Sequence, residues 1–273
     1  MEASAPETAT TCYRHKDRET NVSCSSCGRP ICPDCMTPTP VGMRCPECSR
    51  QKTKVRTAAT LQSEPRLAYA LIAINAIAFI AQVAGGNLNG RAGSVYVDGA
   101  LFGPAVAAGD WWRIITAGFL HAGPLHILLN MYFLWFLGNL LEPAIGKLRF
   151  GIIYFVSLVG GSLGALLVSP GAVTVGASGA VFGLMGAGIL VMRARGIDPM
   201  QSGLGVTLLL NLGISFLIPN ISIGGHIGGL LAGGAVAYLM FELGERQRLA
   251  QNAVLIASAA LGVVLGVAAV LVA

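Results

Sequence analysis

The sequence is poor in charge. Only 11% of its 273 residues are charged, whereas a soluble globular protein carries about 25%. Hydrophobic residues make up 54% of the chain. We therefore expect most of the chain to lie in a lipid bilayer. The net charge of +5 is spread over loops and forms no basic patch with interleaved aromatic residues, so we expect no nucleic-acid partner.

The apolar part of the sequence contains no cysteine. All seven cysteines lie between positions 12 and 48. The N-terminal stretch also lacks the short apolar core and small-residue cleavage site of a secretory signal peptide, so we expect the first apolar segment to act as an uncleaved insertion signal. We predict a polar, disordered tail at 1–11, a cysteine-rich module at 12–48, a basic linker at 49–66 and a membrane domain at 67–273.

The membrane domain reads as apolar segments joined by short loops. A bilayer core of about 30 Å needs about 20 apolar residues in a helix. The sequence predicts an all-α polytopic membrane protein with seven spans, near 67–85, 115–138, 150–168, 177–193, 203–218, 224–242 and 252–273. The connection between the first two spans is unusually long, so we expect it to have structure of its own.

Lysine and arginine are distributed unevenly over the loops. They cluster before the first span, between the second and third, after the fourth and after the sixth. With seven spans all these loops lie on one side, which the positive-inside rule assigns to the cytoplasm. We expect a cytoplasmic N-terminus and an external C-terminus. The Ala- and Gly-rich composition favours a bacterial cell membrane.

Four ligand pairs of equal spacing fill the cysteine-rich module. Two ligands three positions apart can turn toward one ion, and zinc takes four nitrogen or sulfur ligands in a tetrahedron. The pairs are Cys12/His15, Cys24/Cys27, Cys32/Cys35 and Cys45/Cys48. Eight ligands predict two closed, structural Zn²⁺ sites. A disulfide cluster is disfavoured, because the cysteine number is odd and thiols stay reduced in the cytosol.

This spacing resembles B-box-type zinc modules. The resemblance implies a cross-braced pairing, in which the first and third pairs share one ion and the second and fourth share the other. A tandem pairing remains an alternative. A closed zinc site carries no chemistry, so we expect the module to bind a cytosolic protein partner or to stabilise a small fold that lacks a core.

Unusual polar residues recur in three of the predicted spans. His121, His126 and Asn130 lie in the second, Ser178 opens the fourth, and His226 lies in the sixth. All three spans run inward, so these side chains share one depth near the outer surface. Ionisable groups inside a membrane are costly and are functional candidates by default.

Glycines accompany these polar residues at helical spacing. Gly179 and Gly183 are four apart in the fourth span, and Gly225, Gly229 and Gly233 repeat in the sixth. Small residues at this spacing let helices approach closely. Such packing would bring Ser178 and His226 within hydrogen-bonding reach, as in an activated serine nucleophile, with His126 and Asn130 able to donate to an oxyanion.

Each residue also has a simpler interpretation. A serine such as Ser178 is by itself more often a packing residue, and the Gly-x-Ser-x-Gly hydrolase motif is absent because Ala180 holds its last position. His226 alone would also suit a proton path. A small transporter is disfavoured, because the spans lack deep paired acids and inverted halves.

The membrane domain resembles the rhomboid family of intramembrane serine proteases. The resemblance rests on "WWR" at 111–113, "HAGPLHILLN" at 121–130, "GASG" at 176–179 and "GHIGGLLAG" at 225–233. It implies a six-helix bundle, here with one extra C-terminal transmembrane helix. It also implies hydrolysis of peptide bonds in or near the transmembrane helices of other proteins, within the lipid bilayer and without a catalytic cofactor.

The resemblance assigns roles to individual residues. It implies that Ser178 is the nucleophile and His226 the general base. His126 and Asn130 would stabilise the oxyanion, with His121 in support. Trp112, Arg113, Gly176 and Gly179 would be structural. A rhomboid-like protein that binds membrane clients without cutting them is the alternative function.

Overall fold

The computed structural model describes residues 10–50, 64–87, 91–219, 221–245 and 250–273. The chain divides into two compact units, Met1–Leu61 and Gln62–Ala273. Nearly all of the predicted tail at 1–11 and most of the predicted linker at 49–66 lie outside the described residues.

The described part of the first unit is small and has short elements of regular structure. Among its described residues, 10–50, the elements are a 3₁₀ turn at Pro33–Cys35, strands β1 (Thr37–Thr39) and β2 (Gly42–Arg44), which pair antiparallel, and helix α1 (Pro46–Ser49). Its buried hydrophobic cluster consists of cysteines and Ile31. So small an apolar core does not stabilise a fold of this size, which therefore needs another source of stability.

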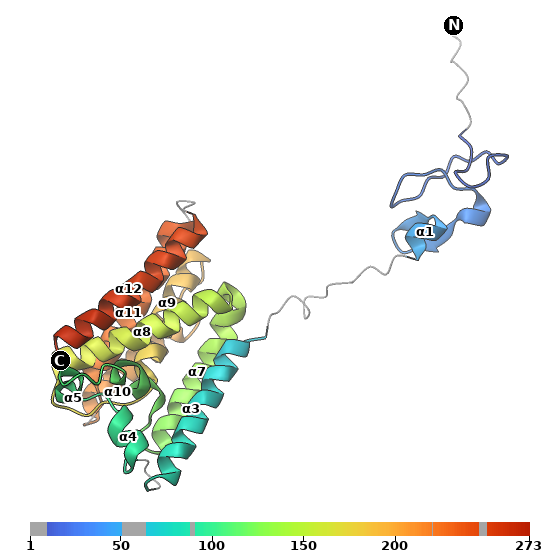
Figure 1. Cartoon of the computed structure of the whole chain (residues 1–273). Helices are drawn as coiled ribbons and strands as arrows, with labels where there is room; N and C mark the ends of the chain where they lie inside the picture. The colour runs from blue at the N-terminus through green and yellow to red at the C-terminus, as the bar shows by residue number, and fades with distance from the viewer. Residues whose placement is uncertain (1–9, 51–63, 88–90, 220, 246–249) are drawn as a thin grey trace. The chain divides into compact units, whose positions relative to one another are not determined.

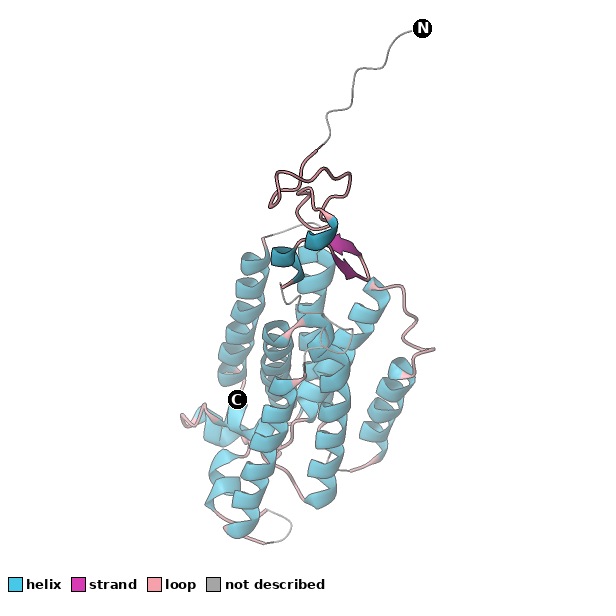
Figure 2. Ribbon diagram, turned by 90° about the vertical axis from the view of Figure 1, so that its right-hand side faces the viewer, coloured by secondary structure: helices cyan, strands magenta, loops and turns pink. Residues whose placement is uncertain are grey.

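The second unit is helical (Figures 1 and 2). Five of its helices are long and apolar enough to span a membrane: α3 (Arg66–Ala84), α7 (Pro124–Ile145), α8 (Lys147–Val168), α11 with its π-helical continuation (Ile223–Ala237 and Tyr238–Glu245), and α12 (Gln251–Leu271). Two shorter apolar helices, α9 (Ser178–Ala194) and α10 (Leu204–Leu217), complete the described bundle. The protein is thus an integral, multi-pass, all-α membrane protein with the predicted order of spans.

The predicted second span is wrong in its boundaries. We expected 115–138, but α7 covers Pro124–Ile145. The stretch before it forms α6 (Arg113–Thr116) and a 3₁₀ turn (Ala117–Phe119) instead. Gly123 has φ 143°, outside the helical region, and Pro124 then occupies the first turn, where its missing N–H costs nothing. His121 therefore precedes α7 rather than lying within it.

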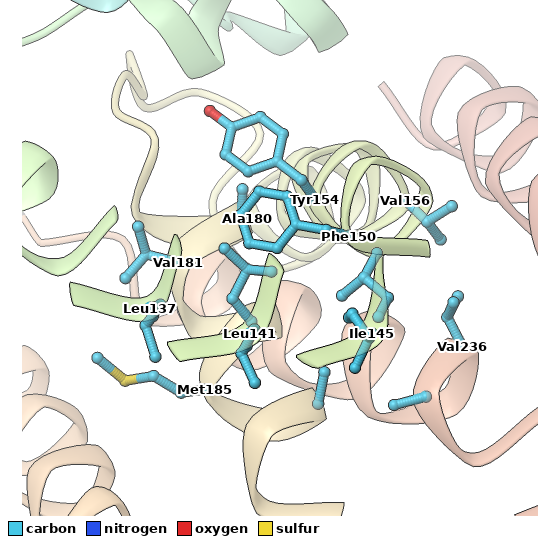
Figure 3. Packing of buried hydrophobic residues seen from close by; sticks show 14 of the residues in the cluster. Leu137, Leu141, Ile145, Phe150, Tyr154, Val156, Ala180, Val181, Met185 and Val236 are labelled. Carbon is cyan, nitrogen blue, oxygen red and sulfur yellow. The ribbon is translucent and has the colours of Figure 1, made fainter. Parts of the chain in front are cut away.

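Helices α7, α8, α9 and α11 contribute side chains to the main core (Figure 3). Leu137 and Leu141 of α7 pack with Phe150 and Tyr154 of α8, all almost fully buried. Large apolar side chains on the outer helix faces are exposed, among them Leu128 and Leu210. That distribution suits a bundle surrounded by lipid.

Glycines let α8, α9 and α11 touch through their backbones. A Cβ at Gly229 would lie 2.0 Å from the Gly179 carbonyl oxygen, and one at Gly233 would lie 2.4 Å from the Gly183 Cα. Helices α9 and α11 thus pack as their glycine spacing predicted. The spacing did not reveal that α8 joins them, where a Cβ at Gly228 would lie 2.3 Å from the Gly160 carbonyl oxygen.

A buried carboxylate connects α3 to α7. Glu142, only 3% exposed, accepts hydrogen bonds from the backbone N–H groups of Leu67 (3.0 Å) and Ala68 (2.8 Å). These donors belong to the first turn of α3, where the helix dipole favours a negative group. Glu142 therefore caps α3 from a neighbouring helix, and α3 and α7 run side by side (Figure 1).

Candidate active site

Ser178 and His226 meet where α9 and α11 begin. Ser178 is the first residue of α9, and His226 lies in the first turn of α11, whose N-terminus is capped by Ser222. The Ser178 Oγ and the His226 Nε2 are 2.8 Å apart, a hydrogen-bonding distance. The glycine contact between Gly179 and Gly229 lies within one turn of this pair along each helix. The close approach of α9 and α11 therefore brings the serine and the histidine together.

Phe182 fixes the plane of the His226 ring. The two rings are stacked, with centroids 4.2 Å apart and an angle of 17° between their planes. Phe182 lies four residues after Ser178, so both side chains project from the same face of α9. Phe182 was not among the residues predicted for the site; its i+4 spacing from Ser178 is the sequence feature that places it on the same helix face.

The second nitrogen of the imidazole also has a partner. His226 Nδ1 lies 2.7 Å from the Oγ of Ser215, which belongs to α10. Ser215 was not among the residues predicted for the site. Three helices therefore contribute side chains to one hydrogen-bonded chain that runs from Ser178 through His226 to Ser215.

His126 presents an N–H to the same space. Its Nδ1 accepts a hydrogen bond from the Ala122 backbone N–H at 3.2 Å, so the proton of the neutral ring is on Nε2. A Cβ placed on Gly176 would lie 2.8 Å from that Nε2 and 3.7 Å from the Ser178 Oγ. The His126 donor and the serine hydroxyl thus flank one small space, which Gly176, at φ 127°, leaves open.

Asn130 and His121 lie beside His126. Asn130 Nδ2 donates to the His126 carbonyl oxygen at 2.9 Å, so one of its two N–H groups is used within α7. His121 is fully buried, and its ring centroid lies 5.2 Å from that of His126. Gln82 of α3 holds the His121 backbone through two hydrogen bonds. His121 therefore supports the His126 ring rather than reaching Ser178.

The loop before Ser178 is attached to the long connection between α3 and α7. Thr174 and Leu101 exchange two backbone hydrogen bonds, of 3.0 and 2.9 Å. The Gly176 N–H donates to the Ala117 carbonyl oxygen at 2.9 Å. The connection contains the short helices α4 (Ser94–Gly99), α5 (Gly103–Ala107) and α6, as its length predicted, and it positions the serine loop.

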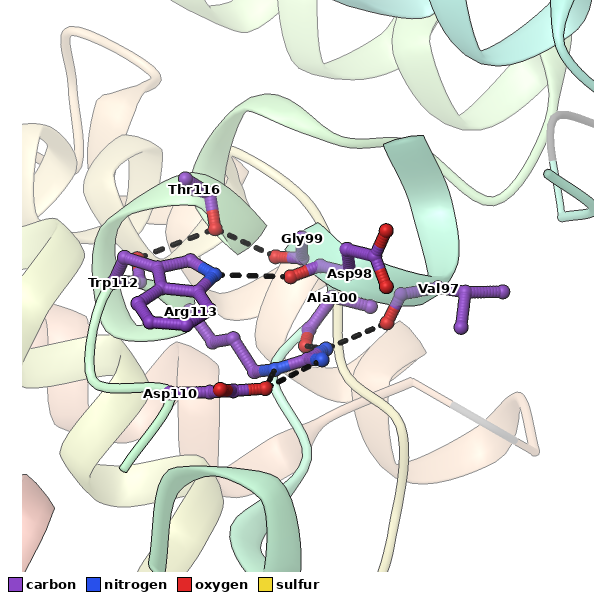
Figure 4. A network of polar contacts seen from close by, with 8 residues as sticks. All are labelled: Val97, Asp98, Gly99, Ala100, Asp110, Trp112, Arg113 and Thr116. Atoms are coloured by element: carbon purple, nitrogen blue, oxygen red, sulfur yellow. Dashed lines mark hydrogen bonds and ion pairs between the residues drawn. The ribbon is translucent and has the colours of Figure 1, made fainter. Parts of the chain in front are cut away.

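Arg113 organises that connection (Figure 4). Its guanidinium donates to the carbonyl oxygens of Val97 (2.6 Å) and Ala100 (2.9 Å) and pairs with Asp110 at 2.9 Å. The Trp112 indole donates to the Asp98 carbonyl oxygen at 3.1 Å. The Trp-Arg pair therefore ties α4 to α6 and, through Ala117 and Leu101, supports the loop that carries Gly176.

The first unit contains two groups of candidate metal ligands. One group is Cys12, His15, Cys32 and Cys35; the other is Cys24, Cys27, Cys45 and Cys48. Within each group all the ligand atoms lie within 4.8 Å of one another. The first ligand pair is thus grouped with the third and the second with the fourth, and all seven cysteines are free thiols.

The distances suit a tetrahedral ion. His15 Nδ1 lies 3.3 Å from Cys32 Sγ and 3.5 Å from Cys35 Sγ, and the sulfurs of Cys27 and Cys45 are 3.8 Å apart. Four ligands about 2.3 Å from a central zinc would be roughly 3.8 Å apart. The chemistry of the donors and their separations therefore fit the metal.

The thiols differ in their readiness to ionise. Hydrogen bonding from the backbone at Cys45 lowers the pKa of Cys24 to about 6. Burial and the neighbouring thiols raise the pKa of Cys35 to about 11. Crowded thiols cannot all carry negative charge unless a cation compensates them, which is the role that a bound metal ion performs.

Comparison with known proteins identifies the family of the chain. The model of the Rhomboid domain family matches residues 108–243, a region that contains the Ser178 and His226 pair and excludes the cysteine-rich unit. Putative rhomboid protease YdcA of Bacillus subtilis is 37% identical over 146 residues, which cover 52% of this chain and 73% of YdcA. The chain belongs to the rhomboid family.

Two further relatives match as well. Rhomboid protease GluP of Bacillus subtilis is 32% identical over 218 residues, which cover 78% of this chain and 42% of GluP. Rhomboid-like protease 3 of Toxoplasma gondii is 34% identical over 147 residues, covering 50% of this chain and 55% of that protein. The chain thus spans less than half the length of GluP.

Proposed function

We propose that the protein is an intramembrane serine endopeptidase. One observation carries the proposal: the 2.8 Å hydrogen bond between Ser178 Oγ and His226 Nε2, formed at the adjoining ends of two membrane helices. A serine hydroxyl is a weak nucleophile until an adjacent base accepts its proton. The names of the relatives, which include three rhomboid proteases, support the same chemistry.

Ser178 and His226 would carry out the hydrolysis in two steps, acylation of the serine and hydrolysis of the acyl ester. Ser178 Oγ attacks the scissile carbonyl carbon while its proton passes to His226 Nε2. The imidazolium then gives that proton to the leaving amine, which departs and leaves an acyl ester on Ser178. Water, deprotonated by His226, attacks the ester, and the proton returns to Ser178 as the acid product leaves.

His126 supplies the donor for the oxyanion. Its Nε2–H faces the space beside Ser178 Oγ, where the carbonyl oxygen of a substrate would acquire negative charge. The backbone N–H of Ser178 lies at the N-terminus of α9 and has no partner within the helix. Asn130 would contribute its remaining amide N–H. A donor of this kind is worth about 10²–10³ in kcat.

We propose transmembrane proteins as the substrates. The site lies at the N-terminal ends of α7, α9 and α11, opposite the helix ends that carry Lys147, the first residue of α8, and Arg193, in the last turn of α9. By the positive-inside rule these basic helix ends would face the cytoplasm and the site would lie near the outer surface. The same rule favours a cytoplasmic N-terminus and an external C-terminus. The Ala- and Gly-rich composition supports a bacterial cell membrane. A helical substrate must unwind to expose its carbonyl group to Ser178.

We propose that the two ligand groups of the first unit hold one structural Zn²⁺ each. Four protein ligands close each site, so the metal would supply folding free energy and no catalysis. Such a module suits the binding of a cytosolic protein partner. Metal analysis of the purified full chain should return two zinc ions per chain; a metal-free, folded first unit would refute the assignment.

Cleavage of a labelled single-span protein in liposomes tests the proposed activity. Ser178→Ala and His226→Ala should each lower kcat by about 10⁴-fold or more, as loss of a nucleophile or base does in other serine proteases. Ser258→Ala is the matched control, because that hydroxyl donates to the Val254 carbonyl oxygen of its own helix α12. Cutting by both mutants at the wild-type rate would refute the proposal.

A further inference from the structure

Ser215 occupies an unusual position on α10. Its side chain is buried, at 2% exposed, whereas its neighbours Ile214 and Phe216 point outward. It is the only buried residue in the C-terminal half of this helix, every residue of which the structure describes. The burial brings the Ser215 hydroxyl to 2.7 Å from His226 Nδ1.

The direction of the hydrogen bonds follows from the proton count. Ser215 Oγ also lies 2.8 Å from the Asn211 carbonyl oxygen, which can only accept. A hydroxyl has one proton, and here it is donated to that carbonyl. The Ser215 oxygen must therefore accept from His226, which places the ring proton on Nδ1. His226 Nε2 is then unprotonated and can accept the proton of Ser178.

We infer that Ser215 is a positioning residue that holds His226 in the tautomer of a general base. This inference rests on the proposed peptidase function. An imidazole with its proton on Nε2 cannot take a proton from Ser178 there. Phe182 fixes the plane of the ring, and Ser215 fixes its rotation within that plane and its tautomer. A neutral hydroxyl thus takes the position that a carboxylate has in a Ser-His-Asp triad.

The arrangement makes the base depend on the position of α10. Only Leu204, Gly205 and Ser215 of this helix are buried, so it is the least enclosed of the helices that contribute to the site. A shift of α10 that carried Ser215 away from His226 would release Nδ1 and allow the inactive tautomer. The inference therefore predicts that α10 affects the chemical step as well as access to it.

Kinetics on the full chain in liposomes test this role. Ser215→Ala should lower kcat for a single-span substrate by about tenfold and leave KM unchanged, because one net hydrogen bond of roughly 1.4 kcal/mol is lost. Ser215→Thr retains the hydroxyl and should recover most of the rate. Ser258→Ala removes an equivalent buried hydroxyl, bonded to its own helix at 2.8 Å, and should have no effect.

A spectroscopic measurement separates positioning from general damage to the fold. ¹⁵N NMR of protein labelled at histidine, at a pH where the imidazole is neutral, should show His226 with an unprotonated Nε2 in the wild type and in Ser215→Thr. Ser215→Ala should show a mixture of tautomers. His121 and His126 signals that do not change would establish that the fold is intact.

The outcomes distinguish this inference from the proposed activity. If Ser178→Ala is inactive while Ser215→Ala matches Ser258→Ala, the peptidase stands and the role of Ser215 is refuted. A wild-type His226 protonated on Nε2 refutes it as well, even if the alanine variant does not fold. If Ser178→Ala cuts normally, the proposed activity itself fails.

Discussion

The two units of this protein reach a fold by different means. The first has a buried cluster of cysteines and Ile31 and would be held by metal ligands. The second has a large apolar core together with helices that touch at glycines. Ligand pairs act over three positions of sequence, whereas the glycine contacts join residues about fifty positions apart. The local spacing of ligands therefore predicts the metal sites of the first unit. The helix contacts of the second unit are fully apparent only in the folded structure.

Removal of metal should have the largest effect, and it should affect the first unit but not the second. A zinc chelator should unfold the first unit, because structural zinc supplies about 10–16 kcal/mol in small modules. Proteolysis of the N-terminal unit should then be rapid, while cleavage of a membrane substrate continues. Cys45→Ser should reproduce the effect, and Ser26→Ala should not. Equal protease resistance with and without metal would contradict this account of the first unit.

The glycine contacts of the bundle should be the next most sensitive feature. Gly229→Ala places a methyl group where the Gly179 carbonyl oxygen lies 2.0 Å away, so α9 and α11 must separate. Misplacing the reacting groups by about 1 Å costs roughly 100-fold in rate. Gly234→Ala, on the same helix with open space around it, is the matched control. Equal kcat/KM values for the two variants would disprove the role of this contact.

The cap on α3 should have the smallest effect. Glu142→Gln weakens the charge-assisted hydrogen bonds to Leu67 and Ala68 by about 1–2 kcal/mol, which lowers Tm by a few degrees. Cleavage should change little, because Glu142 lies near the C-terminal end of α7, whereas the site residues His126 and Asn130 lie near its N-terminal end. Glu64→Gln, on an exposed carboxylate, is the control for thermal unfolding in detergent. A Tm equal to that of the control would exclude the cap as a source of stability.

Much of the site could be predicted from the sequence, because polar residues are rare in the membrane spans. Ser178, His126 and His226 stood out by composition and by shared depth, and the helix spacing of the glycines indicated how two spans would approach. The predicted start of the second span was wrong because the residues before α7 are nearly as apolar as the helix itself. Gly123 and Pro124, a typical helix start, carried the signal that was missed.

Ser215 could not have been found in this way. Ser215 donates to the carbonyl oxygen four residues earlier in its own helix, as apolar-helix serines commonly do. Ser258 makes the same i−4 hydrogen bond in α12, so this pattern does not distinguish Ser215. Which face of α10 turns toward His226 depends on the packing of α10 against α9 and α11. The partners of Glu142 likewise lie about 75 positions away in the sequence, so its role as a cap appears only in the folded chain.

The most direct test of the account is labelling by a fluorophosphonate, which reacts only with an activated serine. Full-length protein in liposomes should be labelled at Ser178, as identified by peptide mass spectrometry. His226→Ala should abolish the labelling although the serine is still present, because the 2.8 Å hydrogen bond that activates it is lost. Labelling of the His226→Ala variant at the wild-type rate, or labelling of wild type at another serine, would contradict the central claim.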